Sequence, residues 1–584
     1  MIKLLKNLRK IDYLWLSISL VLIVGQVLLD LKLPDYIANI TTLVSTEGTP
    51  MSEIWLAGGK MLACALGSAG MAVIVGYLTA NIASNFSYTV RGKVFEKISK
   101  FGIIEMKNFS IPSLITRTTN DITQIQMVIS MGLQIMIKAP VLAICAIIKI
   151  FGKSWELSMV VVCSVIVLII TLLVVMLLVL PKFKKLQKQV DDINRVTEES
   201  LTGVKVIRAF NADNYQSNKF EKVNDTLTKT NLFTMRTLSV LSPMLNMIMS
   251  GLSLAIYYVG ALLINKTAIE SKFAVLGDVM AFSSYGVYVV MGFIMLSMIF
   301  MILPRAQVSA KRINEVLNTT PSIAEGNLTV TNDQKGTIEL KNVSFKFADS
   351  QDYILKDVSF KANKGDTIAI VGASGCGKTT LVNLIARLYD ATEGEVLIDG
   401  VNIKDYTFAS LYSKVGYIPQ KTVMFSSSIK ENIAFGETDY PITDEKIKES
   451  VEIAQGKEFV ESMPKEYNYE IAQGGINISG GQKQRLSIAR VIAREPEILI
   501  FDDSFSALDF KTDKLLRQQL NEKLTDTTCV IVASRIGTIK NANQIIVLDD
   551  GAVAGIGTHE SLMNNCEVYK QIALSQLSKM ELEN

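Results

Sequence analysis

The sequence contains one histidine, His559, in 584 residues, which excludes any metal site that needs several imidazole ligands. Its six cysteines show none of the paired spacings typical of zinc sites or disulfide frameworks. We therefore expect neither a zinc site nor disulfides, and a protein that faces the reducing cytosol. An excess of one charge sign is also missing, since 59 Lys and Arg face 56 Asp and Glu, a formal net charge of +3. This near balance does not indicate a nucleic-acid partner, and we expect none.

What the chain has in abundance is apolar sequence, with 49% hydrophobic residues and a mean hydropathy of +0.31. A chain of this length is expected to divide into domains. Since about 20 apolar residues cross a bilayer, the sequence predicts an α-helical transmembrane domain of six spans over residues 1–305. The six runs are Leu14–Leu33, Ile54–Ala80, Met127–Ile148, Leu157–Leu180, Leu238–Ile264 and Val275–Leu303.

Two long loops, residues 81–126 and 181–236, are rich in lysine and arginine. By the positive-inside rule these loops and both termini are predicted to be cytosolic. Neither loop has the glycine- and serine-rich composition of a flexible linker, so long helical extensions of the spans are expected. A leg of about 25 residues would reach roughly 35 Å into the cytosol.

Residues 1–12 alternate apolar and basic side chains, as a short amphipathic helix would. Such a helix is suited to contact membrane lipid at the inner leaflet. A solvated start to the first span is an equally good interpretation.

Few polar residues interrupt the spans, and among them Asp30 and Lys138 are ionisable. Ionisable groups inside a membrane are candidates for function. Both residues lie near the ends of their apolar runs, so snorkelling toward water is the favoured interpretation. The fifth and sixth runs are rich in methionine, which is typical of ordinary packing and also of surfaces that accept varied apolar ligands.

After a predicted linker over residues 306–336, strands and helices alternate through an α/β domain over residues 337–584. Within it, Gly372–Thr379 fits the G-x-x-x-x-G-K-[ST] pattern between an apolar strand and a helix. This is a P-loop, whose backbone N–H groups bind phosphates, with Lys378 at the β- and γ-phosphates and Thr379 on Mg²⁺. The predicted binding residues are Gly372, Ala373, Ser374, Gly375, Cys376, Gly377, Lys378, Thr379 and Thr380.

Two further segments have residues suited to bind a nucleotide and its metal ion. The strand Ile498–Asp502 ends in an acid suited to Mg²⁺. Ile478–Gln482 places Ser479, Gly480, Gly481 and Gln482 at the start of a basic helix, which forms a second phosphate-binding surface. Because one site does not need two such surfaces, the second is predicted to serve a nucleotide held by another copy of the domain.

Together these motifs resemble an ABC exporter half-transporter, and the resemblance covers essentially the whole chain. Gly372–Thr379 resembles Walker A and Asp502 the Walker B aspartate, while Ile478–Gln482 resembles the LSGGQ signature. Gln420 resembles the Q-loop glutamine, Ser506–Asp509 the D-loop, and Phe347 stands where the family has an adenine-stacking tyrosine. The resemblance implies ATP and Mg²⁺ as cofactors, with Thr379, Gln420 and Asp502 at the metal and ATP sandwiched between two subunits. It also implies coupling helices near residues 108–120 and 210–216.

The sequence departs from the family at two catalytic positions. Asp503 stands in place of the general-base glutamate, and Ser534 in place of the switch histidine; Gln473 replaces a glutamate before the signature. A carboxylate moved by one methylene is expected to cost around a hundredfold in rate. Asp503, Ser534 and Gln420 are therefore catalytic positions of a site that binds ATP and hydrolyses it poorly. A heterodimer with a second half-transporter is predicted, with a slowly hydrolysing homodimer as the alternative.

The function expected from the resemblance is ATP-driven export of small amphipathic compounds, multidrug-type, across a bacterial plasma membrane. A lipid or peptide exporter is the nearest alternative. An ATP-gated channel or switch is a further alternative of another class, although few charged residues are available to line an ionic path.

Overall fold

The computed structural model describes residues 2–46, 48–151, 154–266, 272–329, 335–348, 350–436, 438, 440–533 and 535–576. The chain forms two compact units. The first contains Met1–Lys100 and Ser110–Thr319, and the second contains Phe101–Phe109 and Thr320–Asn584. A short piece of the first long loop therefore belongs to the second unit.

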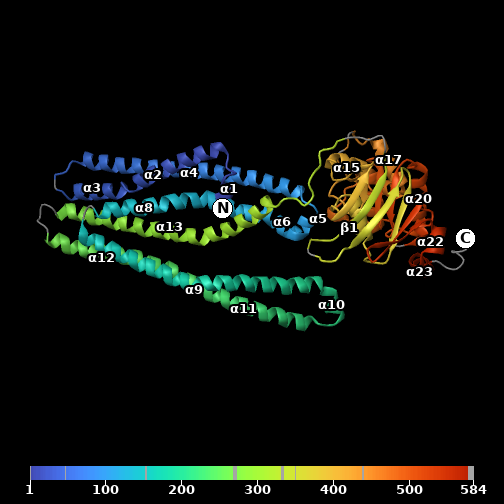
Figure 1. Cartoon of the computed structure of the whole chain (residues 1–584). Helices are drawn as coiled ribbons and strands as arrows, with labels where there is room; N and C mark the ends of the chain where they lie inside the picture. Colours follow the sequence, from blue (N-terminus) through green and yellow to red (C-terminus); the bar gives the residue numbers. More distant parts are fainter. Residues whose placement is uncertain are drawn as a thin grey trace. The chain divides into compact units, whose positions relative to one another are not determined.

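Among its described residues, the first unit contains helices and no strands (Figure 1). Six stretches of helix are long and apolar enough to span a membrane, which confirms the predicted transmembrane domain. Its helices are α1 (Ile2–Leu5), α2 (Lys10–Asp30), α3 (Leu33–Ser45), α4 (Met51–Ser99), α6 (Ile111–Thr118), α7 (Asn120–Met127), η1 (Val128–Gly132), α8 (Leu133–Phe151), α9 (Trp155–Thr202), α10 (Val204–Ala209), α11 (Asp213–Ser239), α12 (Leu241–Lys266) and α13 (Lys272–Asn318).

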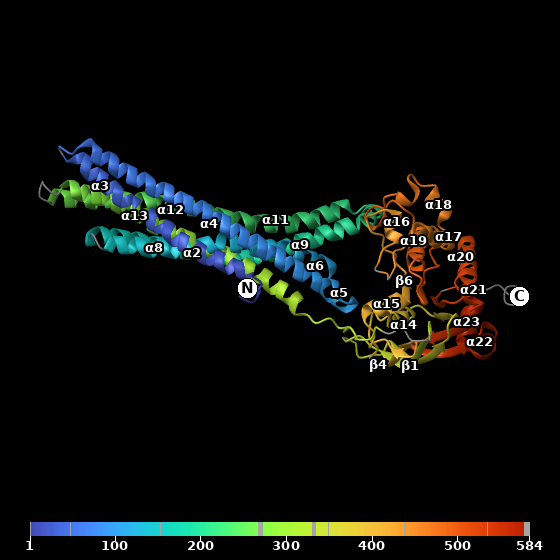
Figure 2. The ribbon, with the colours of Figure 1, turned by 90° about the horizontal axis from the view of Figure 1, so that it is seen from above.

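The helices run well beyond the apolar segments, as predicted for the long loops. α9 and α11 lie side by side and are joined at their far end by the short helix α10 (Figures 1 and 2). The turn is formed by Val204–Ala209, with α11 starting at Asp213, so the segment 210–216 is the junction of two helices rather than one coupling helix. The segment 108–120 is likewise divided, because Ser110 adopts a positive φ of 57° between two helices.

The first span is longer than its apolar run indicates. α2 stops at Asp30, and α3, with Pro34 in its first turn, continues the span to Ser45. Proline is tolerated at a helix start because the N–H that it lacks has no helical partner there. Roughly 20 Å of helix therefore separates Asp30 from Ser45, and roughly 30 Å separates it from Lys10.

The predicted snorkelling of Asp30 and Lys138 is wrong. Lys138 Nζ lies 3.3 Å from Asp30 Oδ2, and the side chains are only 24% and 18% exposed. The hydroxyl of Ser68 also donates to Asp30. A carboxylate far from both ends of its span is stabilised by a partner rather than by water.

A second ion pair joins the same two spans. Lys149 Nζ on α8 lies 2.8 Å from Asp35 Oδ2 on α3, and Tyr285 of α13 donates to Asp35 Oδ1 at 2.6 Å. Lys138 and Lys149 are eleven residues apart, which is close to three full helical turns, so both lie on one face of α8. The first span is thus tied to the third at two levels.

The second unit contains a six-stranded and a four-stranded sheet. The larger has the order β10-β9-β3-β8-β7-β6, parallel except for β10, and the smaller is the antiparallel β2-β1-β4-β5. The strands are β1 (Ile338–Phe345), β2 (Leu355–Ala362), β3 (Thr367–Gly372), β4 (Glu393–Ile398), β5 (Val401–Asn402), β6 (Val415–Ile418), β7 (Ile498–Asp502), β8 (Thr528–Val532), β9 (Gln544–Asp549) and β10 (Ala552–Gly557).

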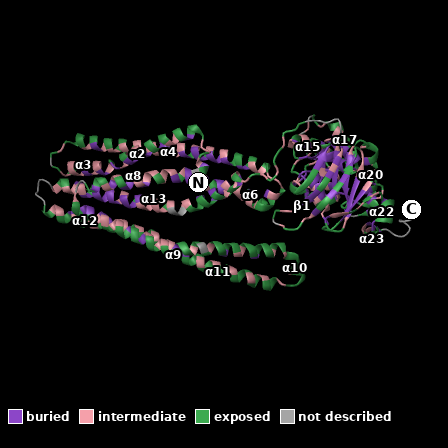
Figure 3. Ribbon diagram, viewed as in Figure 1, coloured by how far each residue is buried: buried purple, intermediate pink, exposed green. Residues whose placement is uncertain are grey.

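Helices cover the sheets and leave the central strands buried (Figure 3). β7 and β8 are buried at every position, as their continuous apolar sequence predicts for parallel strands. The α/β prediction for this part of the chain is therefore confirmed. Its helices are α5 (Ile103–Phe109), α14 (Lys378–Ile385), α15 (Phe408–Lys414), α16 (Ile429–Ile433), α17 (Asp444–Ile453), α18 (Lys457–Glu461), η3 (Glu466–Asn468), η4 (Gln473–Gly475), α19 (Gly480–Ile492), α20 (Phe510–Lys523), α21 (Ile536–Ile539), α22 (His559–Asn565) and α23 (Glu567–Gln576).

The predicted linker over residues 306–336 consists of two different parts. Residues 306–318 continue α13, whereas the described residues after Thr319 belong to the second unit. Gly326 N donates to Tyr406 O at 3.1 Å, and Leu328 N to Asp405 O at 2.8 Å. A Cβ on Gly326 would come within 2.2 Å of Asp405 O, so only glycine allows this close approach.

Candidate nucleotide-binding site

The candidate site lies where neighbouring parallel strands of the larger sheet end. β3 and β7 both pair with β8, and Val532 of β8 is aligned with Ile370 of β3 and with Asp502 of β7. Ligands of open α/β sheets bind at the carboxyl ends of the strands. This register brings the segments after β3, β7 and β8 to one edge, although they are far apart in sequence.

The P-loop connects β3 to α14, as its sequence predicts. Gly375 and Gly377 have φ values of 89° and 99°, in the left-handed region where glycine is unstrained. A Cβ on Gly377 would also lie 2.8 Å from the Leu355 side chain. Lys378 Nζ donates to the carbonyls of Gly372 and Ala373, both at 2.8 Å, so the ammonium is held over the loop.

Two of the three predicted metal ligands, which come from distant motifs, are in contact. Thr379 Oγ1 donates to Asp502 Oδ1 at 3.0 Å. Asp502 is only 2% exposed, and burial raises the pKa of its carboxyl above the ordinary value despite the bonds from Thr379 and Tyr417. A bound cation would favour the charged carboxylate and oppose this effect of burial.

Sequence reasoning missed Tyr417, whose hydroxyl donates to Asp502 Oδ2 at 3.1 Å. Burial raises the pKa of Tyr417, and the adjacent Asp502 raises it further, so the phenol stays protonated and remains a donor. The signal that could have identified Tyr417 is its position just before Gln420. Tyr417 lies in β6, the strand that pairs directly with β7.

Gln420 and Asp503 are also brought together. Gln420 Nε2 donates to Asp503 Oδ2 at 3.3 Å, and the backbone of Asp503 has a positive φ of 48°. Asp503 N donates to Val532 O at 3.1 Å, which fixes the residue beside β8. Ser534, the other predicted catalytic position, lies outside the described residues.

A cavity of about 760 Å³ surrounds the P-loop. Among the described residues that line it, those predicted are Gly372–Gly375, Gly377–Thr380, Gln420 and Asp503. Sequence reasoning missed the contribution of the C-terminal helix α23, which provides Ile572, Ser575 and Gln576. Gln576 Oε1 also accepts from Ile536 N at 2.9 Å, so α23 holds the first residue of α21. No phosphate-binding pattern marks this helix.

Phe347, the predicted adenine-stacking residue, belongs to an aromatic cluster. Its ring centroid lies 5.1 Å from that of Phe345 and 5.6 Å from that of Tyr389, both in edge-to-face geometry. Such contacts hold the ring in a defined orientation. A third neighbour is a cation, since Lys107 Nζ of α5 lies 5.6 Å from the Phe347 ring centroid.

The signature segment forms a separate surface. Ser479 caps α19 by accepting from Gln482 N at 3.3 Å, and the Gln482 side chain accepts from Ser479 N at 2.8 Å. Gly480 has open space where a Cβ would be. Of the described residues lining the P-loop cavity, none comes from Ser479–Gln482. Within one chain, the two predicted phosphate-binding surfaces are therefore distinct.

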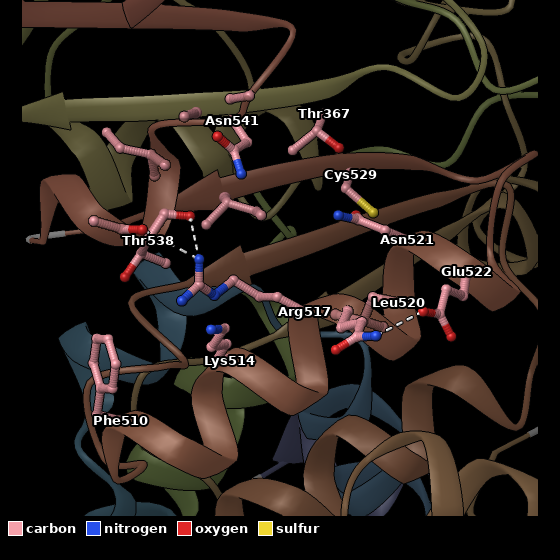
Figure 4. Close-up of a pocket in the computed structure, with 16 residues that line it drawn as sticks. Thr367, Phe510, Lys514, Arg517, Leu520, Asn521, Glu522, Cys529, Thr538 and Asn541 are labelled. Atoms are coloured by element: carbon pink, nitrogen blue, oxygen red, sulfur yellow. Dashed lines mark hydrogen bonds between the residues drawn. The ribbon is translucent and has the colours of Figure 1, made fainter. Parts of the chain in front are cut away.

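A second cavity, of about 550 Å³, lies beside α20, β8 and α21 (Figure 4). Arg517 of α20 forms two 3.0 Å bonds to the buried Asp513 and donates to the carbonyls of Gly537 and Thr538 at 3.2 Å. Arg517 thus joins the helix after the D-loop segment to α21. Cys529 also lines this cavity, and burial raises the pKa of its thiol to about 12, so it is protonated and unreactive.

The donor set fits Mg²⁺ shared with a nucleotide. The hydroxyl of Thr379, the carboxylate of Asp502 and the amide of Gln420 are hard oxygen ligands. Among the residues that the structure describes, no group of three or more His, Cys, Asp or Glu side chains forms an all-protein metal site. Few protein ligands are typical of Mg²⁺ sites completed by phosphates and water.

Comparisons with known proteins also indicate an ATP-binding domain joined to a transmembrane region. Residues 16–293 match the family model described as the ABC transporter transmembrane region, and residues 355–506 match the ABC transporter model. An uncharacterised ABC transporter ATP-binding protein of Mycobacterium tuberculosis is 34% identical, over 89% of this chain and 87% of its own length. A Bacillus subtilis protein named for multidrug export is 32% identical over 85% and 84%. The ATP-dependent lipid A-core flippase of Haemophilus influenzae is 29% identical over 86% and 85%.

A solved structure of a bacterial Atm1-family ABC exporter with ATP bound shares the fold. It aligns with a TM-score of 0.78 at 21% identity, over 97% of this chain and 98% of its own. Two matching family models, an ATPase fold and six candidate spans therefore show that the chain is a member of the ABC transporter family, with an exporter-type transmembrane region followed by one ATP-binding domain.

Proposed function

We propose that this chain is one half of a heterodimeric ABC exporter whose own P-loop binds ATP and Mg²⁺ and hydrolyses ATP poorly. The observation that carries the proposal is Asp503, whose carboxylate stands next to Gln420 at the position of the family's general base. Asp503 is shorter than glutamate by one methylene, and its backbone is fixed by the bond to Val532. This bond opposes a forward shift of the backbone that would compensate for the missing length.

The other residues suit ATP binding. The P-loop amides bind the phosphates, Lys378 neutralises their charge, and the ring of Phe347 stacks on adenine. Bound Mg²⁺ would neutralise charge on the phosphates, held by Thr379, Asp502 and Gln420. For hydrolysis, a water oxygen must bond to the γ-phosphorus while the bond to the β–γ bridging oxygen breaks, and a base must accept the water's proton. Asp503 is the candidate base, and its reach limits this step.

The need for a different partner subunit follows from the short side chain of Asp503. A homodimer of this chain would contain two weak sites, whereas Ser479–Gln482 is intact and suited to complete the site of an opposing subunit. A second half-transporter with a glutamate and a histidine at the two altered positions would hydrolyse ATP there. The slowly hydrolysing homodimer remains the alternative.

The test is co-expression with a candidate second half-transporter and measurement of ATPase activity for each subunit and for the pair. We expect strong activity only from the pair. Replacing Asp503 by Gln here should leave turnover of the pair nearly intact, whereas replacing the partner's glutamate should abolish it. Strong activity of this chain alone would contradict the heterodimer and favour the homodimer.

For the cargo, we propose small amphipathic compounds. The membrane unit exposes methionines on α12 and α13, among them Met247 at 76% and Met298 at 45%, and thioether surfaces adapt to varied apolar ligands. The relative named for multidrug export supports this cargo, and the relative named as a lipid flippase supports a lipid alternative. A peptide cargo and an ATP-gated switch are less favoured. Transport of dyes, lipids and peptides into inverted vesicles distinguishes the cargoes.

We further propose a location in a bacterial plasma membrane with both termini cytosolic, which the basic loops support.

A further inference from the structure

Phe347, the ring predicted to stack on adenine, has a neighbour that does not come from the ATP-binding domain's own sequence. α5 lies in the loop between the second and third spans, yet it forms part of the second unit. Ile104 packs against the apolar core beneath the smaller sheet. α5 is therefore placed by packing as well as by its chain connections.

Glu105 fixes α5 in this place. Its side chain is only 5% exposed, and its two carboxylate oxygens accept from Gly102 N and Ser322 N, each at 2.9 Å. The first bond closes the start of α5, and the second joins α5 to the segment that follows α13. Because Leu328 of this segment pairs with the backbone of Asp405, α5 is anchored to the domain through a continuous set of bonds.

This anchoring places Lys107 over Phe347. The ammonium lies 5.6 Å from the ring centroid, within the range of a cation–π contact, and the Lys107 side chain is otherwise exposed. Phe345 and Tyr389 already contact the ring edge to face. The Phe347 ring is already half-buried, so adenine and Lys107 would compete for its remaining surface.

We infer that Lys107 is a latch on the adenine-binding ring, held by Glu105 as a positioning residue and displaced when ATP stacks on Phe347. This inference rests on the proposed ATP site. Because α5 continues at one end toward α4 and at the other toward α6, release of Lys107 would reach the loop that connects two spans. Binding of adenine would thus be transmitted to the membrane unit through the contact between Lys107 and Phe347, which is separate from the residues that bind the phosphates.

The test measures the affinity of the full-length protein in detergent for ATP with Mg²⁺, by competition with a fluorescent ATP analogue. Lys107→Met removes the charge and keeps an apolar side chain of similar length. We expect it to tighten ATP binding by about two- to fivefold, the range of an exposed cation–π contact. Lys182→Met is the matched control, since Lys182 Nζ lies 5.1 Å from the Phe233 ring centroid in the first unit. It should leave ATP affinity unchanged.

Two further variants identify the mechanism. In a Phe347→Leu background the Lys107→Met change should have no effect on ATP affinity, because the shared ring is gone. Glu105→Ala should tighten ATP binding in the wild type and add nothing in the Lys107→Met background. A purely structural role for Glu105 would instead lower the melting temperature and act equally in both backgrounds.

The possible failures are distinguishable. Wild-type binding of ATP that is unchanged or weakened by Lys107→Met would overturn the latch and leave the proposed ATP site standing. A wild type that does not bind ATP would overturn the proposed site and the latch with it.

Discussion

At the residue scale, the decisive feature is one missing methylene. Asp503 has the charge of a general base, a bond from Gln420 and a backbone held by Val532. Every part of this environment suits a carboxylate, and only its reach differs from glutamate. The defect at this position is therefore one of distance, which a longer side chain should reduce.

We expect Asp503→Glu to raise the ATPase activity of the chain by about 10- to 100-fold, because the longer side chain moves the base toward the attacking water. Steady-state phosphate release from the purified protein measures this effect. Asp503→Asn, which keeps the length and removes the base, should not raise activity. If Asp503→Glu is also without effect, side-chain length is not the limiting defect.

Buried histidine gives the second unit a dependence on pH. His559 is 8% exposed, and its Nδ1 lies 2.7 Å from the Tyr569 hydroxyl. Burial, and secondarily the charge of Lys540, lowers the pKa of His559, while Glu560 opposes this. The unfolded chain, with a histidine pKa of about 6.5, then binds more protons than the folded chain. The stabilisation is complete above that pH and is lost as the pH falls below it.

Melting temperatures of wild type and His559→Gln should therefore diverge between about pH 7.5 and pH 5.5. The wild type should lose stability more steeply, since glutamine does not titrate. Comparing the two proteins removes the common contribution of the carboxylates. Parallel curves would show that His559 is not the group responsible.

At the scale of elements, charge pairs connect the first and third spans. Removing one member of a buried pair leaves an uncompensated charge, whereas replacing both by apolar or neutral groups is close to neutral. Asp30 and Lys138 lie 3.3 Å apart and their side chains are only 18% and 24% exposed, so each charge is compensated mainly by the other rather than by water.

We expect Lys138→Met to destabilise the protein by about 3 kcal/mol, and the double change Asp30→Asn with Lys138→Met to recover most of that loss. Thermal unfolding in a fixed detergent measures both. Lys182→Met, which removes a cation that stacks on Phe233, is the control with little expected change. Additive effects of the two single changes would argue against the pair.

Much of this arrangement was predictable from sequence, and some was not. The P-loop and the Asp502 strand have local patterns, so their roles follow from short motifs. Tyr417, Gln576 and Lys107 act through tertiary contacts and carry no such pattern. Asp30 was predicted to lie near the end of the first span because a polar turn follows it. A hydropathy profile places the end of a span at such a turn, although the helical span continues beyond it.

At the scale of the whole molecule, the chain contains two half-sites. Its P-loop cavity and its Ser479–Gln482 surface are separate within one chain, so each needs another subunit to form a complete site. The two halves are unequal, because the P-loop side has a weak base while the signature side is intact.

We expect Gly480→Asp to abolish the ATPase activity of the assembled transporter without changing the melting temperature of this subunit. Open space surrounds Gly480, so the fold accepts a side chain, but the new carboxylate would repel the opposing nucleotide's phosphates. ATPase assays of the pair measure the effect. Retained activity would place the signature surface away from the nucleotide.

The most direct test of the account is a joint measurement of ATP binding and ATP turnover on the purified chain alone in lipid nanodiscs. We predict one ATP bound per chain and turnover below about 0.1 per second. This limit follows because a typical enzyme turns over at about 10 per second and the misplaced base costs about a hundredfold. Turnover of several per second by the chain alone would contradict a site that holds ATP and hydrolyses it poorly.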